Sequence, residues 1–234
     1  MIERIDTEPG TIAFGAPRTK QRRAAGATLA AAAVIFFLAE FIAAAAWTDP
    51  PYSYTYHYIS DLGVRGPLEA LDQYMYSPLA WVMNTGFFLY GVVVFAGAAM
   101  LTGLRGGRRG AVLVLAAVVG AGSVLLAFFP GDGQADTYHG LGAMAAIVGG
   151  NVLIILVGRW YRRHGVARRP GRAMVVLGAF GLVSTVAFLA VAGSGANVLV
   201  GLVERCAVYP VLVGLLCAGV SIGRARRPGE LDQS

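Results

Sequence analysis

Six long apolar stretches alternate with short polar or basic connections along the chain. A helix that spans a membrane needs roughly 20 mainly apolar residues, because lipid offers the backbone no hydrogen-bond partner. The stretches cover residues 25–47, 78–104, 111–129, 138–160, 173–192 and 198–222. The pattern predicts an all-α, polytopic membrane protein with a six-helix transmembrane domain over 25–222, a disordered tail over 1–24 and a second tail over 223–234.

The composition supports a protein whose surroundings are lipid rather than water. Hydrophobic residues make up 56% of the chain and charged residues 14%, whereas a soluble domain carries about 25% charged residues. Arginine is far commoner than lysine and stands beside abundant Ala, Gly and Val, which is typical of a GC-rich bacterial genome. We therefore expect a multi-pass protein of the bacterial plasma (inner) membrane.

The basic residues predict the orientation. Of the 19 Lys and Arg residues, 17 lie in the two tails and in the second and fourth connections, which share one side of the membrane if there are six spans. Because Lys and Arg are enriched in cytoplasmic segments, both tails are predicted to be cytoplasmic. This distribution explains the net charge of +6 without a nucleic-acid partner. We expect membrane lipids as partners, and a homo-oligomer or other membrane proteins as further partners to test.

The connection between the first two spans contains YSYTYHYISDLG, residues 52–63. Its tyrosines alternate as in a strand, but a single strand would have no pairing partner. An aromatic belt at the membrane surface is the favoured interpretation, and a lid that packs on a ligand is the alternative. Residues 64–76 follow, with Leu68, Leu71 and Met75 on one side of a helical projection. That spacing predicts a short helix lying on the membrane.

Polar side chains inside the spans mark the candidate binding site. An ionisable residue costs about 2.5–3.5 kcal/mol at the bilayer centre on insertion scales, so it should face the bundle interior or a wet cavity. At about 1.5 Å of rise per residue, the polar residues of several spans fall in the outer leaflet. The candidate lipid-binding residues are Glu40, Asn84, Glu204, Arg205 and Tyr209. They predict an outward-facing polar cavity, lined by the first, second, fourth and sixth spans and roofed by residues 52–76.

Arg205 has two interpretations at this stage. In the first, it pairs with a carboxylate and locks helices together. In the second, it holds a lipid phosphate or another anion, with tyrosines around it at the depth of the headgroups.

A catalytic interpretation rests on His57, Ser60 and Asp61, which share one face if their segment is helical. The candidate catalytic residues are Ser60, Asp61 and His139, and a zinc ion held by His57, His139 and Asp61 would have ligands of a suitable kind. The competing interpretation is that Ser60 and Asp61 cap a turn and that His139 begins a helix whose dipole keeps it neutral. We expect no cofactor, with zinc as the alternative.

Several spaced motifs resemble a known family. They are HYISDLGV, NTGFFLYG, FPGDG, TYHGLGA and GLVERCAVYP. Together, over about residues 25–222, they resemble the bacterial membrane family of domain of unknown function 998. The ISDLG core is also similar to the ISDTG-type segment of the six-span Frag, DRAM and Sfk proteins, which are linked to lipid remodelling, lipid distribution and autophagy. The resemblance directs attention to Ser60, Asp61, His139, Glu204 and Arg205.

We therefore expect a protein that recognises or moves a lipid or amphiphile through the outward-facing polar cavity, with Arg205 and His139 near its headgroup. The alternative is a membrane-embedded hydrolase or transferase that uses the His, Asp, Ser and Glu side chains. A third hypothesis is an assembly factor for another membrane complex, for which glycine-rich faces left unused by the bundle would be the sign.

Overall fold

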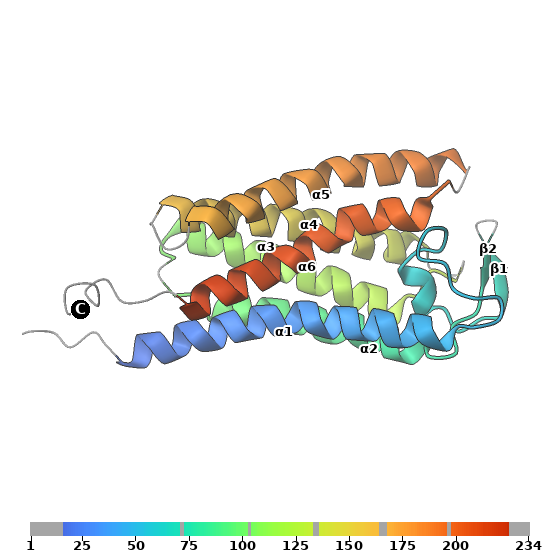
Figure 1. The fold of residues 1–234 in the computed structure, drawn as a ribbon, viewed down its shortest axis with the longest axis horizontal. Coiled ribbons are helices and arrows are strands. Elements are labelled where there is room, and N and C mark those ends of the chain that lie inside the picture. Colours follow the sequence, from blue (N-terminus) through green and yellow to red (C-terminus); the bar gives the residue numbers. More distant parts are fainter. Residues whose placement is uncertain are drawn as a thin grey trace, which may run out of the picture.

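The computed structural model describes residues 16–70, 73–102, 104–132, 136–163, 168–195 and 198–224. Within these residues, six helices are long and apolar enough to cross a membrane, and they lie side by side along one axis (Figure 1). They are α1 (Ala16–Ala46), α2 (Ala80–Ala99), α3 (Gly107–Phe128), α4 (Asp136–Arg163), α5 (Arg168–Ser194) and α6 (Val200–Arg224). The prediction of an all-α protein with six spans is confirmed.

The first helix is longer than predicted. It begins at Ala16 rather than at Ala25, so residues 16–24, which we predicted to be disordered, are helical. Lys and Arg are good helix formers, and the basic residues of this segment let α1 continue beyond its apolar part. Residues 1–15 and 225–234, the rest of the two predicted tails, lie outside the described residues.

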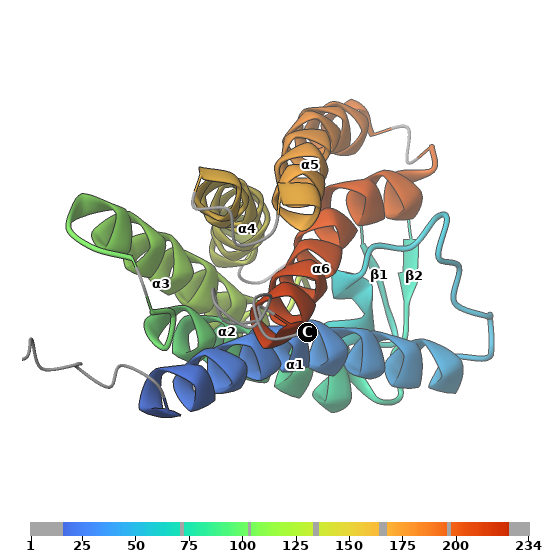
Figure 2. The ribbon, with the colours of Figure 1, turned by 60° about the vertical axis from the view of Figure 1, so that its left-hand side comes forward.

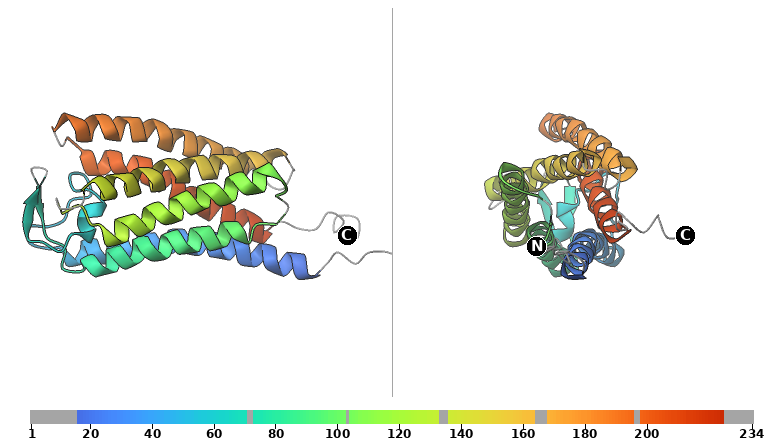
Figure 3. Two further views of the ribbon diagram at one scale, coloured as in Figure 1. Left: turned by 180° about the vertical axis from the view of Figure 1, so that it is seen from behind. Right: turned by 90° about the vertical axis from the view of Figure 1, so that its left-hand side faces the viewer.

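Five of the six helices form a ring. Each helix packs on the next one in the chain, α6 packs on α1, and α4 also contacts α6. The contact between α4 and α6 closes the ring without α5, which lies outside it against those two helices, as the views in Figure 2 and along the bundle in Figure 3 show. The interior of the ring is therefore bounded by α1, α2, α3, α4 and α6.

Small residues allow the helices to approach closely. Glycines face each other in the pairs Gly26 with Gly219, Gly91 with Gly120, Gly122 with Gly142, and Gly158 with Gly171. A Cβ atom added to Gly122 would lie 2.6 Å from the carbonyl oxygen of Gly142, so larger side chains would push α3 and α4 apart. The glycines of α4 serve two contacts, because Gly142 faces α3 and Gly150 faces Val211 of α6.

The segment that we predicted to be an interfacial helix contains a β-hairpin instead. Strands β1 (Leu68–Ala70) and β2 (Gln73–Met75) pair antiparallel, with Leu68 opposite Met75. This cross-strand pairing brings together two of the apolar residues whose spacing suggested a helix, and it satisfies backbone groups that a single strand would leave unpaired. Leu71 lies outside the described residues. The prediction of a helix over 64–76 was therefore wrong.

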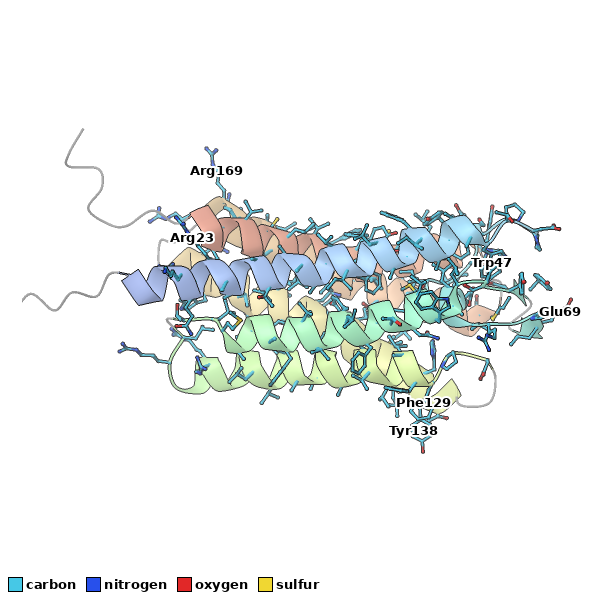
Figure 4. The ribbon with its side chains drawn as sticks, turned by 90° about the horizontal axis from the view of Figure 1, so that it is seen from below. Arg23, Trp47, Glu69, Phe129, Tyr138 and Arg169 are labelled. Carbon is cyan, nitrogen blue, oxygen red and sulfur yellow. The ribbon has the colours of Figure 1, made fainter. Side chains whose placement is uncertain are left out.

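The two ends of the bundle differ in character. Arg23 and Arg169 lie at one end, and Trp47, Glu69, Phe129 and Tyr138 lie at the other (Figure 4). We call the first the arginine-rich end and the second the loop end, because it carries the α1–α2 connection, residues 47–79. That connection includes one turn of 3-10 helix, η1 (Ser60–Gly63).

Candidate functional site

The α1–α2 connection is inserted into the loop end of the ring. Asp61, Leu62 and Gly63 of η1 are buried, and η1 contacts both α1 and α2. The flanking residues Ile59 and Val64 are only 2% and 1% exposed. Because its flanking residues are apolar, this segment is more stable inside the bundle than in water. In that position it closes the ring at the loop end.

Two neighbouring residues of α6 hold the inserted segment through its backbone. Glu204 Oε2 accepts a hydrogen bond from the backbone N–H of Ile59 at 2.5 Å. Arg205 Nη1 donates to the carbonyl oxygens of Tyr54 at 2.8 Å and His57 at 3.2 Å. The side chains of Glu204 and Arg205 thus form hydrogen bonds with backbone groups of the loop that are not paired in a helix or a strand. We call Glu204 and Arg205 the loop clamp.

The close fit between the loop and α6 depends on Gly201. A Cβ atom at this position would overlap the carbonyl oxygen of His57. The neighbouring Leu202 N–H donates to the carbonyl oxygen of Thr55 at 3.1 Å. The first turn of α6 therefore serves as a docking surface for residues 54–59.

Arg205 also makes a buried ion pair with Glu40 of α1. Arg205 Nη2 lies 3.0 Å from Glu40 Oε1, and Tyr209 donates its hydroxyl hydrogen to the same oxygen at 2.9 Å. Arg205 Nη2 also donates to the Tyr52 hydroxyl, and Nε donates to Glu40 Oε1 at 3.1 Å, so all three guanidinium nitrogens are bonded to protein atoms. The interpretation of Arg205 as the partner of a carboxylate is confirmed. An arginine free to receive a lipid phosphate does not fit this arrangement.

The tyrosines of the loop divide between two roles. Tyr52 and Tyr54 place their rings 5.6 and 4.8 Å from the guanidinium carbon of Arg205, which adds a cation–π attraction to the loop clamp. Tyr58 is buried against Phe188 of α5. Tyr54 and Tyr56 are exposed, as an aromatic belt requires, so the predicted belt accounts for only part of the series.

Asp61 and Asn84 both bind the backbone of the loop and stabilise its turn. Asp61 Oδ2 accepts the backbone N–H of Tyr58 at 2.8 Å, and Asn84 Nδ2 donates to the carbonyl oxygen of Gly63 at 2.9 Å. Burial raises the pKa of Asp61 well above its ordinary value, and the nearby charge of Glu204 raises it further. Asp61 therefore caps its own turn, as the non-catalytic interpretation predicted.

The two histidines lie in separate places and face different partners. His57 Nδ1 accepts the backbone N–H of Ser53 at 2.9 Å, and its ring packs on Trp47 and Tyr52. Burial lowers the pKa of His57, and the positive charge of Arg205 adds to the shift. His139 Nδ1 lies 2.8 Å from the carbonyl oxygen of Phe129, where α3 ends.

The residues predicted to hold zinc are not brought together. In the part of the chain that the structure describes, no three His, Cys, Asp or Glu side chains are close enough to share a metal ion. His57, His139 and Asp61 each use a ring nitrogen or a carboxylate oxygen on the backbone instead. The donor set therefore does not fit a zinc site.

A cavity lies inside the ring, directly beneath η1. It is a narrow space with a volume of about 40 Å³. Its apolar walls come from α1, α2, α3, α4 and α6, and include Phe36, Phe87, Tyr90, Leu126, Ile147 and Val211. Ser60 of η1 and Glu204 of the loop clamp lie in its polar part. The ring of helices thus encloses an apolar chamber with a carboxyl group.

This chamber differs from the predicted outward-facing polar cavity. Of the predicted site residues, only Ser60 and Glu204 line it. Glu40, Arg205 and Tyr209 form their network between α1 and α6 beside it, and Asn84 binds Gly63. The walls of this cavity are apolar, because the polar side chains of the spans bind one another and the loop backbone instead. Their roles in binding a lipid stay a prediction.

The aromatic residues of the lining and those from α3 were not predicted from the sequence. Phe36, Phe87 and Tyr90 are ordinary members of apolar spans, and the apolar part of α3, residues 110–128, has no ionisable side chain to draw attention to Ser123. The sequence offers one signal in Ala146, a small residue four positions from both Gly142 and Gly150, which leaves space for the cavity.

Comparison with known proteins gives a family and no established activity. The family model described as "Protein of unknown function (DUF998)" matches residues 13–221. No curated protein and no solved structure matches the chain.

Proposed function

The chain belongs to the DUF998 family, and we propose that it is a non-catalytic membrane protein that recognises a single-chain lipid or amphiphile. The observation that carries this proposal is the apolar cavity inside the ring of five helices, with Ser60 and Glu204 in its polar part. Ligand sites are typically apolar hollows with a few polar groups that orient the ligand. The cavity has a lining of that kind, with a volume of about 40 Å³.

The walls support an apolar chain as the buried part of the ligand. Phe36 packs edge-on against both Phe87 and Tyr90, with ring centroids 5.7 and 5.3 Å apart. These rings, together with Val208 and Val211 of α6, give an apolar lining. An alkyl chain can be buried against it without leaving a polar group unpaired. The cavity is narrow, so we propose a single unbranched chain.

The polar residues support a headgroup that donates hydrogen bonds. Glu204 is the one charged residue among the described residues of the lining, and no lining residue is basic. Arg205, which directly follows it, is bonded to Glu40 and to the loop. An amine or a hydroxyl therefore fits the carboxyl group of Glu204 and the hydroxyl of Ser60, whereas a phosphate would meet a carboxylate.

The same geometry disfavours the hydrolase alternative. Ser60 lies at the cavity, but among the described residues neither histidine is hydrogen-bonded to it. Asp61 is engaged with the backbone of Tyr58. A serine nucleophile needs a base within hydrogen-bond reach, and in the described part of the chain no hydrogen bond joins Ser60 to a base.

For the setting, we propose the bacterial plasma membrane, with the arginine-rich end on the cytoplasmic side. The position of Arg23 and Arg169 at one end of the bundle (Figure 4) supports this orientation. Movement of a ligand between the cavity and the outside would require Ile59 and Ser60 to part from Glu204.

The test is a binding titration on the purified full-length protein, with dodecylamine as the probe and native mass spectrometry as the readout. Ala146→Leu adds bulk at the cavity wall, and Ala121→Leu on the exposed face of α3 is the matched control. We expect Ala146→Leu to weaken binding by about tenfold or more, equivalent to about 1.4 kcal/mol, and Ala121→Leu to leave it unchanged. Equal affinity in all three proteins would contradict the proposal.

The headgroup assignment has its own control. Dodecanol and dodecyl phosphate share the chain of dodecylamine but replace the amine by a neutral donor or an anion. The wild type should bind the amine most tightly and the phosphate most weakly, and Glu204→Gln should reduce the preference for the amine over the alcohol. Preference for the phosphate would refute the assignment.

A further inference from the structure

A second feature lies at the arginine-rich end and is independent of the central cavity. Five arginines from the adjacent ends of α4 and α5 line an open hollow, which we call the arginine basin. They are Arg159, Arg162, Arg168, Arg169 and Arg172. All five side chains are exposed, and Figure 4 shows Arg169 at the opposite end of the bundle from Trp47.

Tight backbone packing keeps these charges together. A Cβ atom on Gly158 would lie 2.7 Å from the carbonyl oxygen of Gly171, and one on Gly171 would lie 2.7 Å from that of Gly158. Arg159 and Arg172 directly follow these two glycines in the sequence. The close contact between α4 and α5 therefore fixes the spacing of the arginines that follow the two glycines, although their like charges repel each other.

Acidic residues of α4 and α5 do not offset this charge. Between Asp136, the first residue of α4, and Glu204 in α6, the sequence contains no Asp or Glu. Asp136 lies at the other end of α4 from Arg159. The anion that neutralises the basin must therefore come from outside these two helices. Arginine is well suited to a phosphate, because its planar fork donates two parallel hydrogen bonds to two oxygens.

An apolar groove adjoins the arginine basin and shares Arg159 with it. The groove lies between α3 and α4, and its lining includes Leu104, Ala111, Val112, Leu156 and Trp160. Arg108 of α3 flanks the groove on the other helix. A bound molecule can thus place a phosphate among the arginines and an alkyl chain along the groove, which is the chemistry of an anionic lipid.

We propose that the arginine basin binds a phosphate group carried by a membrane lipid, whose alkyl chain lies along the groove beside Trp160. The site serves the leaflet at the arginine-rich end, whereas the cavity of the proposed function lies beneath the loop at the other end. The two sites differ in charge, because the basin is lined by arginines and the cavity contains Glu204.

The experiment compares phosphatidic acid with phosphatidylcholine and with inorganic phosphate, added to the purified full-length protein. Thermal stability and native mass spectrometry give the affinity. Phosphatidic acid should raise the melting temperature and remain bound, and phosphatidylcholine should not. Arg168→Gln with Arg172→Gln should weaken binding of phosphatidic acid by about tenfold or more, given about 1 kcal/mol per basic residue near anionic lipid.

Two matched variants separate a built site from general attraction. Lys20→Gln with Arg23→Gln removes the same charge from exposed positions on α1 at the same end, and should leave the affinity unchanged. Arg168→Lys with Arg172→Lys keeps the charge but loses the planar fork, so it should bind more weakly than the wild type and more tightly than the Gln pair. Full binding by the Lys pair, or equal losses in the α1 and α5 Gln pairs, would overturn the proposal.

The inorganic phosphate arm identifies the source of the phosphate. Stabilisation by phosphatidic acid at concentrations where inorganic phosphate has no effect supports the lipid. Stabilisation by inorganic phosphate alone would overturn the assignment to a lipid. All variants are first compared without ligand, and because the substituted side chains are exposed, their melting temperatures should match that of the wild type.

Discussion

Arg205 Nη2 lies 3.0 Å from Glu40 Oε1, and the two side chains are 6% and 0% exposed. The pair joins α1 to α6, and the same guanidinium group binds the carbonyl oxygens of Tyr54 and His57 in the loop. One arginine therefore fixes two helices and the segment that closes the cavity. Its role is to hold the roof in place, and the ligand that we propose would meet Glu204 and Ser60 instead.

Breaking this pair should be costly. Glu40→Gln or Arg205→Gln leaves a buried charge without its partner, which typically destabilises a protein by about 3–5 kcal/mol. The measurement is the free energy of unfolding in mixed detergent micelles. Arg65→Gln, at an exposed arginine of the same loop, is the control and should have little effect.

Arg205→Lys is the sharper variant. A lysine keeps the charge but cannot reach Glu40 and two carbonyl oxygens at once, so it should recover less than half of the lost stability. Full recovery by lysine would show that the charge alone matters and that the backbone contacts do not.

Gly201 and Gly140 should respond in opposite directions to the same substitution. An alanine in a helix is more favourable than glycine by about 1 kcal/mol, and at Gly140 no neighbouring atom lies within 4 Å of the added Cβ atom. At Gly201 the Cβ atom would overlap the carbonyl oxygen of His57. Gly201→Ala should therefore loosen the loop, whereas Gly140→Ala should not.

Limited trypsin digestion reports on that loosening through the rate of cleavage after Arg65. The rate should rise several-fold in Gly201→Ala and stay at the wild-type level in Gly140→Ala. Equal rates in the two variants would mean that the loop does not depend on its contact with Gly201.

Asp61 should make the protein less stable as the pH rises. Its pKa is raised in the folded state from an ordinary value of 3.8 by burial and by Glu204, while the Tyr58 N–H and Arg205 act in the opposite direction. Between 3.8 and the raised pKa, the folded state binds more protons than the unfolded state, so stability falls with increasing pH across that window. Asp61→Asn should remove this fall, as measured by melting temperature from pH 4 upwards. An unchanged pH profile in the variant would contradict the account.

His57 should make the protein less stable as the pH falls below 6.5, which is the opposite of the effect of Asp61. Its pKa is lowered from 6.5 by burial and by Arg205, so below pH 6.5 the unfolded state binds more protons than the folded state. Stability is therefore lost as the pH falls from 6.5 through the lowered pKa. His57→Phe keeps a ring against Trp47 and Tyr52 and should flatten this part of the profile. A wild-type slope in the variant would assign the acid sensitivity to another group.

The sequence was sufficient to locate the spans, because each consists of a long apolar stretch whose length is set by the thickness of the bilayer. It also placed Glu40 and Arg205 at similar depths, since depth follows from the rise of the helix. It could not give their pairing, because that depends on how each helix is rotated about its axis. The β-hairpin was missed because the spacing of Leu68 and Met75 fits a helix as well as a cross-strand pair.

The cavity could not be predicted from the sequence for a related reason. It depends on where the side chains of five helices stop short of one another, and no motif records that arrangement. Phe36 and Ala146 line it from different helices, and each would be equally acceptable in a filled core. Glu204 was recognised from the sequence by its charge. Its position between the loop backbone and the cavity could be seen only in the folded structure.

The central claim is that the ligand's chain lies inside the ring of five helices. Photo-crosslinking tests it directly, with a dodecylamine analogue that carries a diazirine in its chain and with mapping of the labelled residues by mass spectrometry. The account predicts labels on lining residues such as Phe87 and Val211, and loss of these labels when unlabelled dodecylamine competes. Helix α5 lies outside the ring. Labels confined to its exposed residues, such as Val183 and Val186, would contradict a ligand chain inside the ring.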